Sequence, residues 1–370
     1  MVKKLIHKVA SNHLARSAGK ALFRCFPGLA AQYCIQQECK PLRAEAQRFF
    51  AQPGLTLPEG ASREDYFNAL RVHGVSVSEY LHQYKFYDKT EQERSKFISR
   101  AHARGVSLRL RMMFPDYDNI ALLRDKERFL AHYEALGYCR RRWLYCPQAT
   151  YEEFVRLVSS TDCILKDHDS SLGISIMKLA KQQDGAELKA LFDKCVAHKT
   201  LVEEFIQGSE ALQAFHPSSL NTVRVYTIAH GNKARPFGAF LRMGMGDMII
   251  DNAHAGGLFA QINIDTGIIE SEGITTEGMR VNIHPDSNLP IKGFTIPHWE
   301  EIIEFCLSAA RQTKNVITGW DVVETIDGHL EFIEANSRPD FDVLQSPLVI
   351  GVKGKLLDML HDVTGRKITV

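Results

Sequence analysis

Three oxygen-bearing side chains, Asp321, Glu334 and Asn336, lie close together in the stretch GWDVVETIDGHLEFIEANSRPD, residues 319–340. The stretch is predicted to be a β-hairpin, because two apolar, β-branched runs flank an Asp-Gly turn signal. Antiparallel pairing would bring the three side chains to the same end of the hairpin, with Glu334 and Asn336 on one face. Such oxygen ligands suit Mg²⁺, which completes its shell with water and phosphate oxygens. The alternative interpretation is an acidic hairpin end that faces solvent.

A second stretch, CILKDHDSSLGISIMKL (residues 163–179), has the arrangement of a phosphate-binding turn. Lys166 ends a short predicted strand, and a second strand is expected at residues 174–179. The polar turn between them contains Ser170, Ser171 and Gly173. Small residues let backbone N–H groups approach phosphate oxygens, and the lysine supplies charge. An ordinary hairpin has the same pattern. Neither a P-loop nor a dinucleotide-binding glycine motif occurs.

Two strands predicted at residues 221–229 and 234–243 each carry an arginine, Arg224 and Arg242. Burying an unpaired guanidinium is costly, so each is expected to face solvent or a site. Both are therefore candidate anion ligands. Asn252 and a Gly-Gly pair follow in a loop before a strand expected at residues 258–264, which indicates a turn or a close approach of backbone to ligand.

The elements that must position these residues follow one another in alternating helices and strands. Helices are expected at residues 118–137, 151–159 and 186–198, and a strand at residues 200–206. Lys126 stands in an Asp-Lys pair that opens a helical turn, and the strand at residues 200–206 contains the sequence VEEFI.

In this order the motifs resemble the ATP-grasp superfamily, over residues 118–340. The sequences NTVRVYTI, LRM, DNAHAGG and GWDVV…FIEAN resemble the glutamate ligases that modify ribosomal protein tails. They are more similar still to the ATP-grasp group associated with sugar transfer and surface-polysaccharide loci, which also has a Tyr-rich helical N-terminal segment. The resemblance implies an α/β (α+β) fold of two lobes with antiparallel sheets that clasp ATP, preceded by a helical region.

The resemblance also implies a role for individual residues. Lys126 and Lys166 would contact the α and β phosphates, and Ser170, Ser171 and Gly173 would belong to the loop that closes over them. Adenine would be read by Glu203, Glu204, Phe205 and Ile206, largely through backbone groups, and ribose by Glu210. Mg²⁺ would be held by Asp321, Glu334 and Asn336, and the acyl phosphate neutralised by Arg224 with Arg242 and Asn252 nearby. Many relatives have a proline where this chain has Asp167, so its lid geometry is expected to differ.

The function that the resemblance implies is an ADP-forming carboxylate–amine ligase, with ATP and Mg²⁺ as cofactors. A uronic acid of a surface polysaccharide is the expected carboxylate, and an amino acid or other small amine the partner. Three alternatives stay open: an amino-acid or peptide-tail ligase, an inactive nucleotide-binding accessory protein, and a scaffold protein without nucleotide.

The chain is expected to divide into a helical region at residues 1–111, a first ATP-grasp lobe at 112–208 and a second at 209–370. The first 50 residues hold nine basic and two acidic side chains. The basic ones are Lys3, Lys4, Lys8, Arg16, Lys20, Arg24, Lys40, Arg43 and Arg48. Apolar residues at helical spacing up to Pro27 predict a basic amphipathic helix, which would contact an anionic membrane surface or pack on its own protein.

Composition excludes several classes of protein. The chain has 370 residues, 45% hydrophobic, and a net charge of +1, which favours a large core and no nucleic-acid partner. It contains no run of eighteen apolar residues and no convincing signal peptide, so a cytoplasmic protein, at most peripheral at the inner membrane face, is expected. The eight cysteines include no CxxC pair, which favours reduced thiols.

Overall fold

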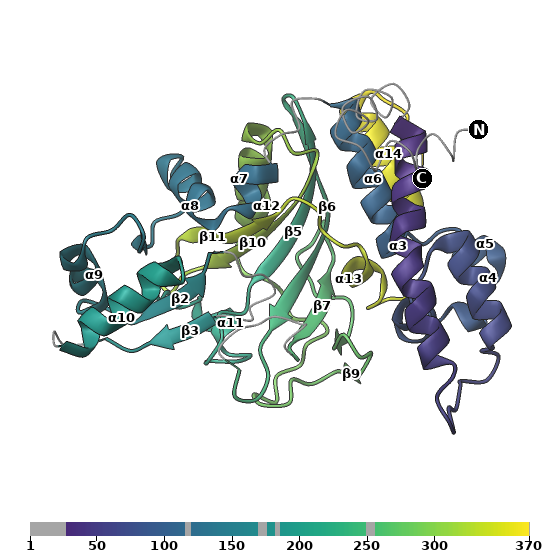
Figure 1. Cartoon of the computed structure of the whole chain (residues 1–370), viewed down its shortest axis with the longest axis horizontal. Coiled ribbons are helices and arrows are strands. Elements are labelled where there is room, and N and C mark those ends of the chain that lie inside the picture. The colour runs from purple at the N-terminus through teal and green to yellow at the C-terminus, as the bar shows by residue number, and fades with distance from the viewer. Residues whose placement is uncertain (1–26, 115–119, 169–175, 182–185, 249–255, 370) are drawn as a thin grey trace.

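The computed structural model describes residues 27–114, 120–168, 176–181, 186–248 and 256–369, and its centre is a seven-stranded antiparallel sheet (Figure 1). The strand order is β11-β10-β5-β6-β7-β8-β9. The strands are β5 (Val223–His230), β6 (Lys233–Met243), β7 (Leu258–Ile262), β8 (Gly273–Ile274), β9 (Arg280–Val281), β10 (Ile317–Glu324) and β11 (Leu330–Asn336). The strands predicted in this part of the chain are confirmed, with ends that shift by a few residues.

Both faces of this sheet are covered, which explains the nearly continuous apolar run of β5. Val223 and Val225 pack in the cluster that contains α12 (Trp299–Gln312). Tyr226 and Ile228 project to the other face and pack with α6 (Arg100–Met113) and α14 (Lys353–Thr364). The sheet is therefore the middle layer between α12 and the pair α6 and α14 (Figure 1).

A smaller sheet with its own core projects to the left in Figure 1. Its antiparallel order is β1-β4-β2-β3, with strands β1 (Trp143–Tyr145), β2 (Cys163–Asp167), β3 (Ile176–Leu179) and β4 (Thr200–Glu204). The helices α9 (Tyr151–Val158) and α10 (Ala186–Ala197) cover it, and Phe154 and Phe192 fill the space between helices and strands. Thr150 begins α9 with a capping box closed by Glu153, in agreement with the predicted helix.

The single helix predicted at residues 118–137 is wrong. Two helices, α7 (Ile120–Arg124) and α8 (Lys126–Ala135), meet at Asp125. Asp125 has extended backbone angles and accepts a hydrogen bond from the N–H of Arg128, so it caps α8 instead of continuing α7. The apolar spacing is helical across both pieces, and only the cap marks the break. A short helix, α11 (Glu210–Gln213), follows β4 along the chain.

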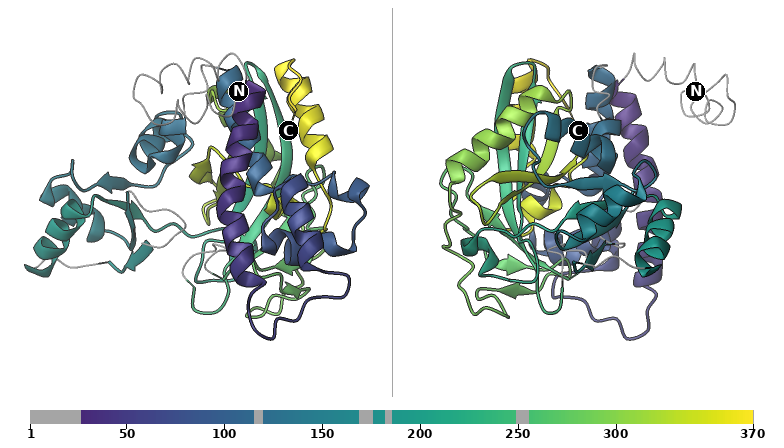
Figure 2. Two further views of the ribbon diagram at one scale, coloured as in Figure 1. Left: turned by 45° about the vertical axis from the view of Figure 1, so that its right-hand side comes forward. Right: turned by 90° about the vertical axis from the view of Figure 1, so that its left-hand side faces the viewer.

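The predicted helical N-terminal region is confirmed for the described residues. It contains α3 (Pro27–Phe49), α4 (Arg63–His73), the π-helix η1 (Glu79–Gln83), η2 (Phe86–Asp88), α5 (Glu91–Arg94) and α6. The predicted helical region includes α3 but gave no bounds for it; the helix contains Pro41 and lies along α6 (Figures 1 and 2). The basic helix predicted before Pro27 lies outside the described residues.

Among the described residues, no helix combines the length and the apolar character needed to cross a membrane. The seven cysteines in the described part of the chain are all free thiols.

One buried glutamine joins the helical region to the C-terminal elements. Gln345, at the end of α13 (Asp342–Gln345), accepts a hydrogen bond from the N–H of Ile98 at 3.0 Å. Its amide nitrogen donates to the carbonyl of Ile98 at 2.9 Å and to the hydroxyl of Tyr84 at 3.0 Å. Nearby, the N–H of Lys353 donates to the carbonyl of Lys96 at 2.9 Å. The helical region is therefore held as one wall of the molecule.

Gly351 makes this junction sterically tight. A Cβ at Gly351 would lie 2.4 Å from both the carbonyl carbon and the oxygen of Lys96, whereas one at Gly354 would meet nothing within 4 Å. We expect Gly351→Ala to lower the free energy of unfolding by about 1–3 kcal/mol, as overpacking does. Gly354→Ala, inside α14, should raise it by up to about 1 kcal/mol through helix propensity. Thermal unfolding of both variants checks this, and a Gly351→Ala protein as stable as wild type would contradict the close contact.

Candidate active site

A cleft of about 1160 Å³ is lined by all three parts of the molecule: the small sheet, the large sheet and the helical region. The predicted residues that line it are Lys126, Lys166, Glu203, Glu204, Phe205, Ile206, Arg224, Arg242, Glu334 and Asn336. Asp321 is buried directly behind Arg224. Glu210 is exposed at the start of α11 and is not among the lining residues, so its predicted ribose contact lacks support. Ser170, Ser171, Gly173 and Asn252 lie outside the described residues.

The predicted hairpin is confirmed, and its register brings the proposed metal ligands to one end. Asp321 pairs directly with Glu334, and Gly319 pairs with Asn336. At the opposite end the N–H of Thr325 donates to the carbonyl of His329 at 2.7 Å. Gly328 adopts φ +76° in this turn, a left-handed conformation that glycine tolerates best.

Asp321 is held by two arginines. Its side chain is 0% exposed. Arg224 on β5 donates two hydrogen bonds to it, one from Nε to Oδ1 and one from Nη2 to Oδ2 at 2.5 Å. Arg242 on β6 adds a bond from Nη2 to Oδ2 at 2.6 Å. Burial opposes ionisation of Asp321, but the two guanidinium groups outweigh it and lower the pKa of the carboxyl to about 2. The predicted arginines are thus paired side chains of the cleft wall.

Glu334 is the accessible member of the set. Its side chain is 57% exposed and lies 3.4 Å from Nη2 of Arg224. Although the side chain is exposed to the cleft, desolvation by the surrounding protein raises the pKa of Glu334. The neighbouring charge of Asp321 raises this pKa further, and the guanidinium of Arg224 lowers it. Asn336 keeps its side-chain oxygen near the strand end, where it accepts a hydrogen bond from the N–H of Arg338 at 2.9 Å.

These donors fit a magnesium ion in chemistry, since all three offer oxygen from one end of the hairpin. Both oxygens of Asp321, however, already accept hydrogen bonds from Arg224 or Arg242. Direct ligation by Asp321 therefore requires one of these arginines to share or leave the carboxylate.

The lysine side of the cleft is built on a buried glutamate. Lys166 at the end of β2 lies 2.7 Å from Oε1 of Glu203. Arg141 donates from Nε to Oε2 of Glu203 at 2.6 Å and from Nη1 to Glu331 on β11 at 3.0 Å. Burial disfavours the ionised Glu203, but Lys166 and Arg141 lower its pKa to about 2. This network connects the small sheet to the metal-site hairpin.

Sequence reasoning missed Arg141. It stands between two other arginines, and nothing in the local pattern separates it from them. Arg142 is exposed and pairs with Glu204, while Arg140 contacts His329. Arg141 becomes part of the site only because the fold brings Glu203 and Glu331, which lie on different strands, into contact with it.

Lys126 is positioned by the end of β2. Its Nζ donates to the carbonyl of Asp167 at 2.6 Å and contacts that of His168 at 3.4 Å. Burial lowers the pKa of Lys126, and the positive charge of Lys166 lowers it further. His168, which the sequence analysis did not single out, lies with Nε2 3.0 Å from Asp125, the cap of α8. The two predicted lysines therefore share one wall of the cleft.

The end of β4 carries the residues predicted to read adenine. The Glu203 side chain belongs to the buried network, and Glu204 pairs with Arg142 at 2.9 Å. The Phe205 N–H donates to the carbonyl of Asp162 at 2.8 Å, and Nζ of Lys178 lies 3.8 Å from the centre of the Phe205 ring. Both glutamate side chains are held in ion pairs. That adenine is read largely by backbone groups stays a prediction.

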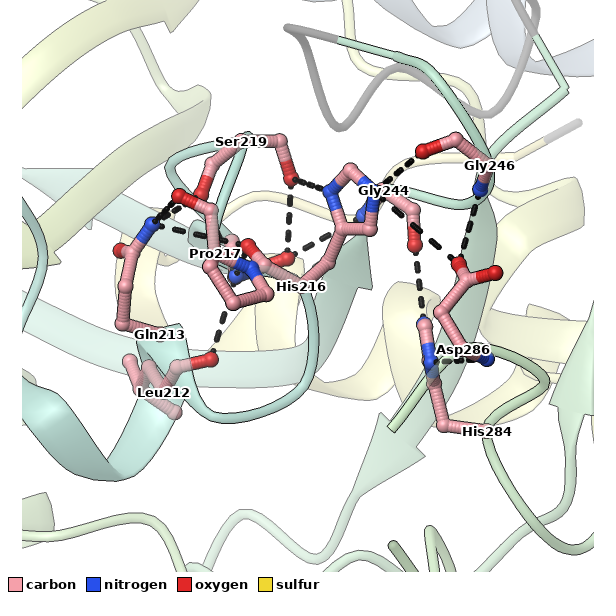
Figure 3. Close-up of polar contacts among 10 residues, drawn as sticks. Leu212, Gln213, His216, Pro217, Ser219, Gly244, Gly246, His284 and Asp286 are labelled. Atoms are coloured by element: carbon pink, nitrogen blue, oxygen red, sulfur yellow. Dashed lines mark hydrogen bonds and ion pairs between the residues drawn. The ribbon is translucent and has the colours of Figure 1, made fainter. Parts of the chain in front are cut away.

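Two histidines anchor the turn that follows β6, as Figure 3 shows. His216 lies 2.8 Å from the carbonyl of Gly246, and His284 lies 2.9 Å from that of Gly244. Asp286 accepts the N–H of Gly246 at 2.8 Å. Burial lowers the pKa of His284, which favours the neutral ring. The turn that directly follows Arg242 and Met243 is thereby held in place.

The depressed pKa of Glu203 predicts a loss of stability in acid. The unfolded chain, in which the carboxyl has its usual pKa of 4.5, takes up a proton before the folded chain, whose pKa is about 2. The contribution of Glu203 is therefore present above pH 4.5 and lost as the pH falls towards 2. As the pH falls from 4.5 towards 2, the free energy of unfolding of Glu203→Gln should therefore decrease less than that of wild type. Urea unfolding at several pH values measures this difference. The exposed Glu187→Gln is the control, and an unchanged pH dependence in Glu203→Gln would contradict the network.

Solved structures with similar folds were found at low identity. An ATP-grasp ligase, PsnB, complexed with precursor peptide PsnA2 and AMPPNP, is 18% identical with a TM-score of 0.44, over 74% of this chain and 70% of PsnB. D-alanyl-alanine synthetase A from Vibrio cholerae is 12% identical with a TM-score of 0.43, over 66% of each chain. D-alanine–D-alanine ligase from Bacillus anthracis is 14% identical with a TM-score of 0.40, over 66% of this chain and 68% of that chain. No curated protein matches the sequence.

A family comparison covers more than half of the chain. Residues 148–358 match the family described as sugar-transfer associated ATP-grasp, and they include the cleft strands β2, β4, β5, β6, β10 and β11. The chain therefore belongs to the sugar-transfer associated ATP-grasp family, which confirms the predicted fold.

Proposed function

We propose that this protein is a carboxylate–amine ligase that uses ATP and Mg²⁺. It would activate a carboxylate as an acyl phosphate and join it to an amine, and the carboxylate would be a uronic acid used in surface-polysaccharide biosynthesis. In the first step a carboxylate oxygen attacks the γ-phosphorus of ATP and ADP leaves. In the second the amine nitrogen attacks the acyl carbon, phosphate leaves and one proton is released. The observation that carries the proposal is that one cleft is lined by Lys126 and Lys166, Arg224 and Arg242, and Glu334 and Asn336.

The lysines are suited to bind the nucleotide phosphates. Lys126 and Lys166 lie on one wall of the cleft. Burial lowers the pKa of Lys126, and repulsion by the positive charge of Lys166 lowers it further. Phosphate oxygens between them would relieve this repulsion, which favours binding of a polyanion. Glu203 orients Lys166 by its 2.7 Å contact, so the network with Arg141 would position the phosphate-binding charge.

The arginine pair is suited to the phosphoryl group in transfer. Glu334, Asn336 and Asp321 would hold Mg²⁺, which would supply positive charge to the phosphate groups. Arg224 already lies between Asp321 and Glu334, within 3.4 Å of both. A small rotation would direct part of its guanidinium to the phosphoryl oxygens, while Arg242 keeps Asp321 ionised.

The substrate class is supported by the family description and by the chemistry of the cleft. The family is associated with sugar transfer, and a uronic acid is a sugar that carries the required carboxylate. An amino-acid or peptide carboxylate would use the same reaction centre, so the substrate must be decided by assay.

The decisive assay is release of ADP and phosphate with uronic acids, amino acids and short peptides as carboxylates, each with and without a pool of amines. ADP formation that requires both a uronic acid and an amine is expected. Release of AMP would contradict the acyl-phosphate mechanism, and activity with amino acids or peptides but not with uronic acids would contradict the proposed substrate.

Glu334→Gln tests the metal assignment. Because the Glu334 side chain is exposed to the cleft and touches Arg224 only at 3.4 Å, the variant should fold normally and lose turnover by about 10²-fold or more. Asp327→Asn, in the turn at the far end of the same hairpin, is the matched control, since Asn-Gly suits the turn equally. Wild-type turnover in Glu334→Gln, with an unchanged melting temperature, would refute the role of Glu334.

We also propose that the protein acts in the cytoplasm and that its basic N-terminal segment contacts the anionic inner face of the membrane. The support is the excess of lysine and arginine in the first 50 residues. The full chain should sediment with vesicles that contain anionic lipid, and a chain that lacks residues 1–26 should remain in the supernatant. Equal sedimentation of the two would contradict an anchoring role.

A further inference from the structure

One part of the cleft wall comes from the helical region and has no role in the reaction described above. It lies where η1 and the start of α6 meet the loop before α13. The residues concerned, all of which line the cleft, are Ser76, Glu79, Gln83, Arg100, Asp340 and Asp342.

Three carboxyl groups gather at this place. Nε of Arg100 lies 3.5 Å from Asp340, and its Nη2 lies 3.2 Å from Oδ2 of Asp342. A single guanidinium, 45% exposed, thus serves two carboxylates at rather long distances. Glu79 adds a third carboxyl group, which accepts hydrogen bonds from the N–H groups of Ser76 and Arg100 at 2.6 and 2.8 Å.

Two acceptor atoms here have no donor in the described part of the chain. Oδ1 of Asp342 and Oε1 of Gln83 are both buried and without a hydrogen-bond partner. The Asp342 side chain is only 9% exposed. A buried carboxylate oxygen without a donor is destabilising, and such atoms in native proteins usually have a partner. The residues Gln83 and Asp342 line the same cleft, and η1 is in contact with α13. A ligand with several N–H donors would satisfy them together.

The backbone around Gln83 has an unusual form. Gln83 ends η1, a π-helical turn, and the N–H of Tyr84 donates to the carbonyl of Glu79 at 2.8 Å. Such turns are rare and frequently occur at functional sites.

This place adjoins the proposed reaction centre. The hydroxyl of Tyr226, two residues beyond Arg224 on β5, donates to the carbonyl of Asp340 at 2.6 Å. Pro339 packs beside Arg224, since a Cβ on Gly319 would lie 3.2 Å from Cδ of Arg224 and 3.2 Å from Cβ of Pro339. The loop that carries Asp340 and Asp342 therefore borders the arginine proposed to contact the acyl phosphate.

We propose that Gln83, Asp340 and Asp342 form an amine recess that binds the ammonium group of the second substrate. A primary ammonium group brings one positive charge and three N–H donors, which match the carboxylates and the two unpaired acceptors of Gln83 and Asp342. The inference rests on the proposed ligase function, since it assigns a place to the second substrate of that reaction. It also gives the helical region a part in substrate binding.

The test uses the full chain with Mg²⁺ and AMPPNP, titrated with n-butylammonium and, as a neutral probe of similar shape, n-butanol, by saturation-transfer NMR. Wild type should bind n-butylammonium and not n-butanol. The dissociation constant should rise about tenfold or more in Asp342→Asn, because a hydrogen bond to a charged group is lost. Asp358→Asn, an exposed carboxylate on α14 outside the cleft, should bind as wild type does.

Equal affinities in wild type and Asp342→Asn, or equal binding of the two probes, would overturn the amine recess. If Asp342→Asn melts early, Gln83→Leu takes its place, with the same expected loss and the same contradicting result. Nucleotide binding by each protein is measured separately. Loss of nucleotide binding in wild type would count against the ligase proposal, whereas wild-type nucleotide binding without an ammonium preference would count against the recess alone.

Discussion

The buried carboxylate of Asp321 is the constraint on which the centre of this molecule depends. It lies between Arg224 and Arg242, so three neighbouring strands, β10, β5 and β6, meet at one charged point. Removing one partner of a buried ion pair typically costs about 3–5 kcal/mol, because the remaining charge is left unpaired. The register of these strands is therefore tied to the same groups that line the cleft. A shift of one residue would turn Asp321 to the opposite face, away from both arginines.

A second buried cluster repeats this arrangement on the lysine side of the cleft. Arg141 contacts Glu203 on β4 and Glu331 on β11, and Lys166 reaches Glu203 from β2. Charges that would serve ligands thus also join the two sheets. Because the same charges would bind ligands and also join the sheets, many ionised side chains are buried at the cleft although the net charge of the protein is only +1. It also means that the helical region, joined through Gln345, meets the active cleft as a fixed wall.

Much of the local structure followed from local patterns. The hairpin of β10 and β11 was predictable because period-two burial, β-branched residues and an Asp-Gly turn all agree within about twenty residues. The strands around Arg224 and Arg242 were predicted for the same reason. The break between α7 and α8 was missed, since Asp125 acts through a cap and the apolar spacing continues across it. The extent of α3 was not predicted within the helical region, because Pro41 lies inside a helix that packs against α6.

By itself the sequence determined the order of motifs, the family that they resemble, and the oxygen-rich end of the hairpin, because each depends on residues near one another in the chain. Only the tertiary structure decided which charges meet. Arg141 with Glu331, Lys166 with Glu203 and Arg100 with Asp342 join residues far apart in sequence, and their pairing depends on how the sheets and helices pack. The unpaired oxygens of Gln83 and Asp342 belong to the same class, because an atom lacks a partner only with respect to everything folded around it.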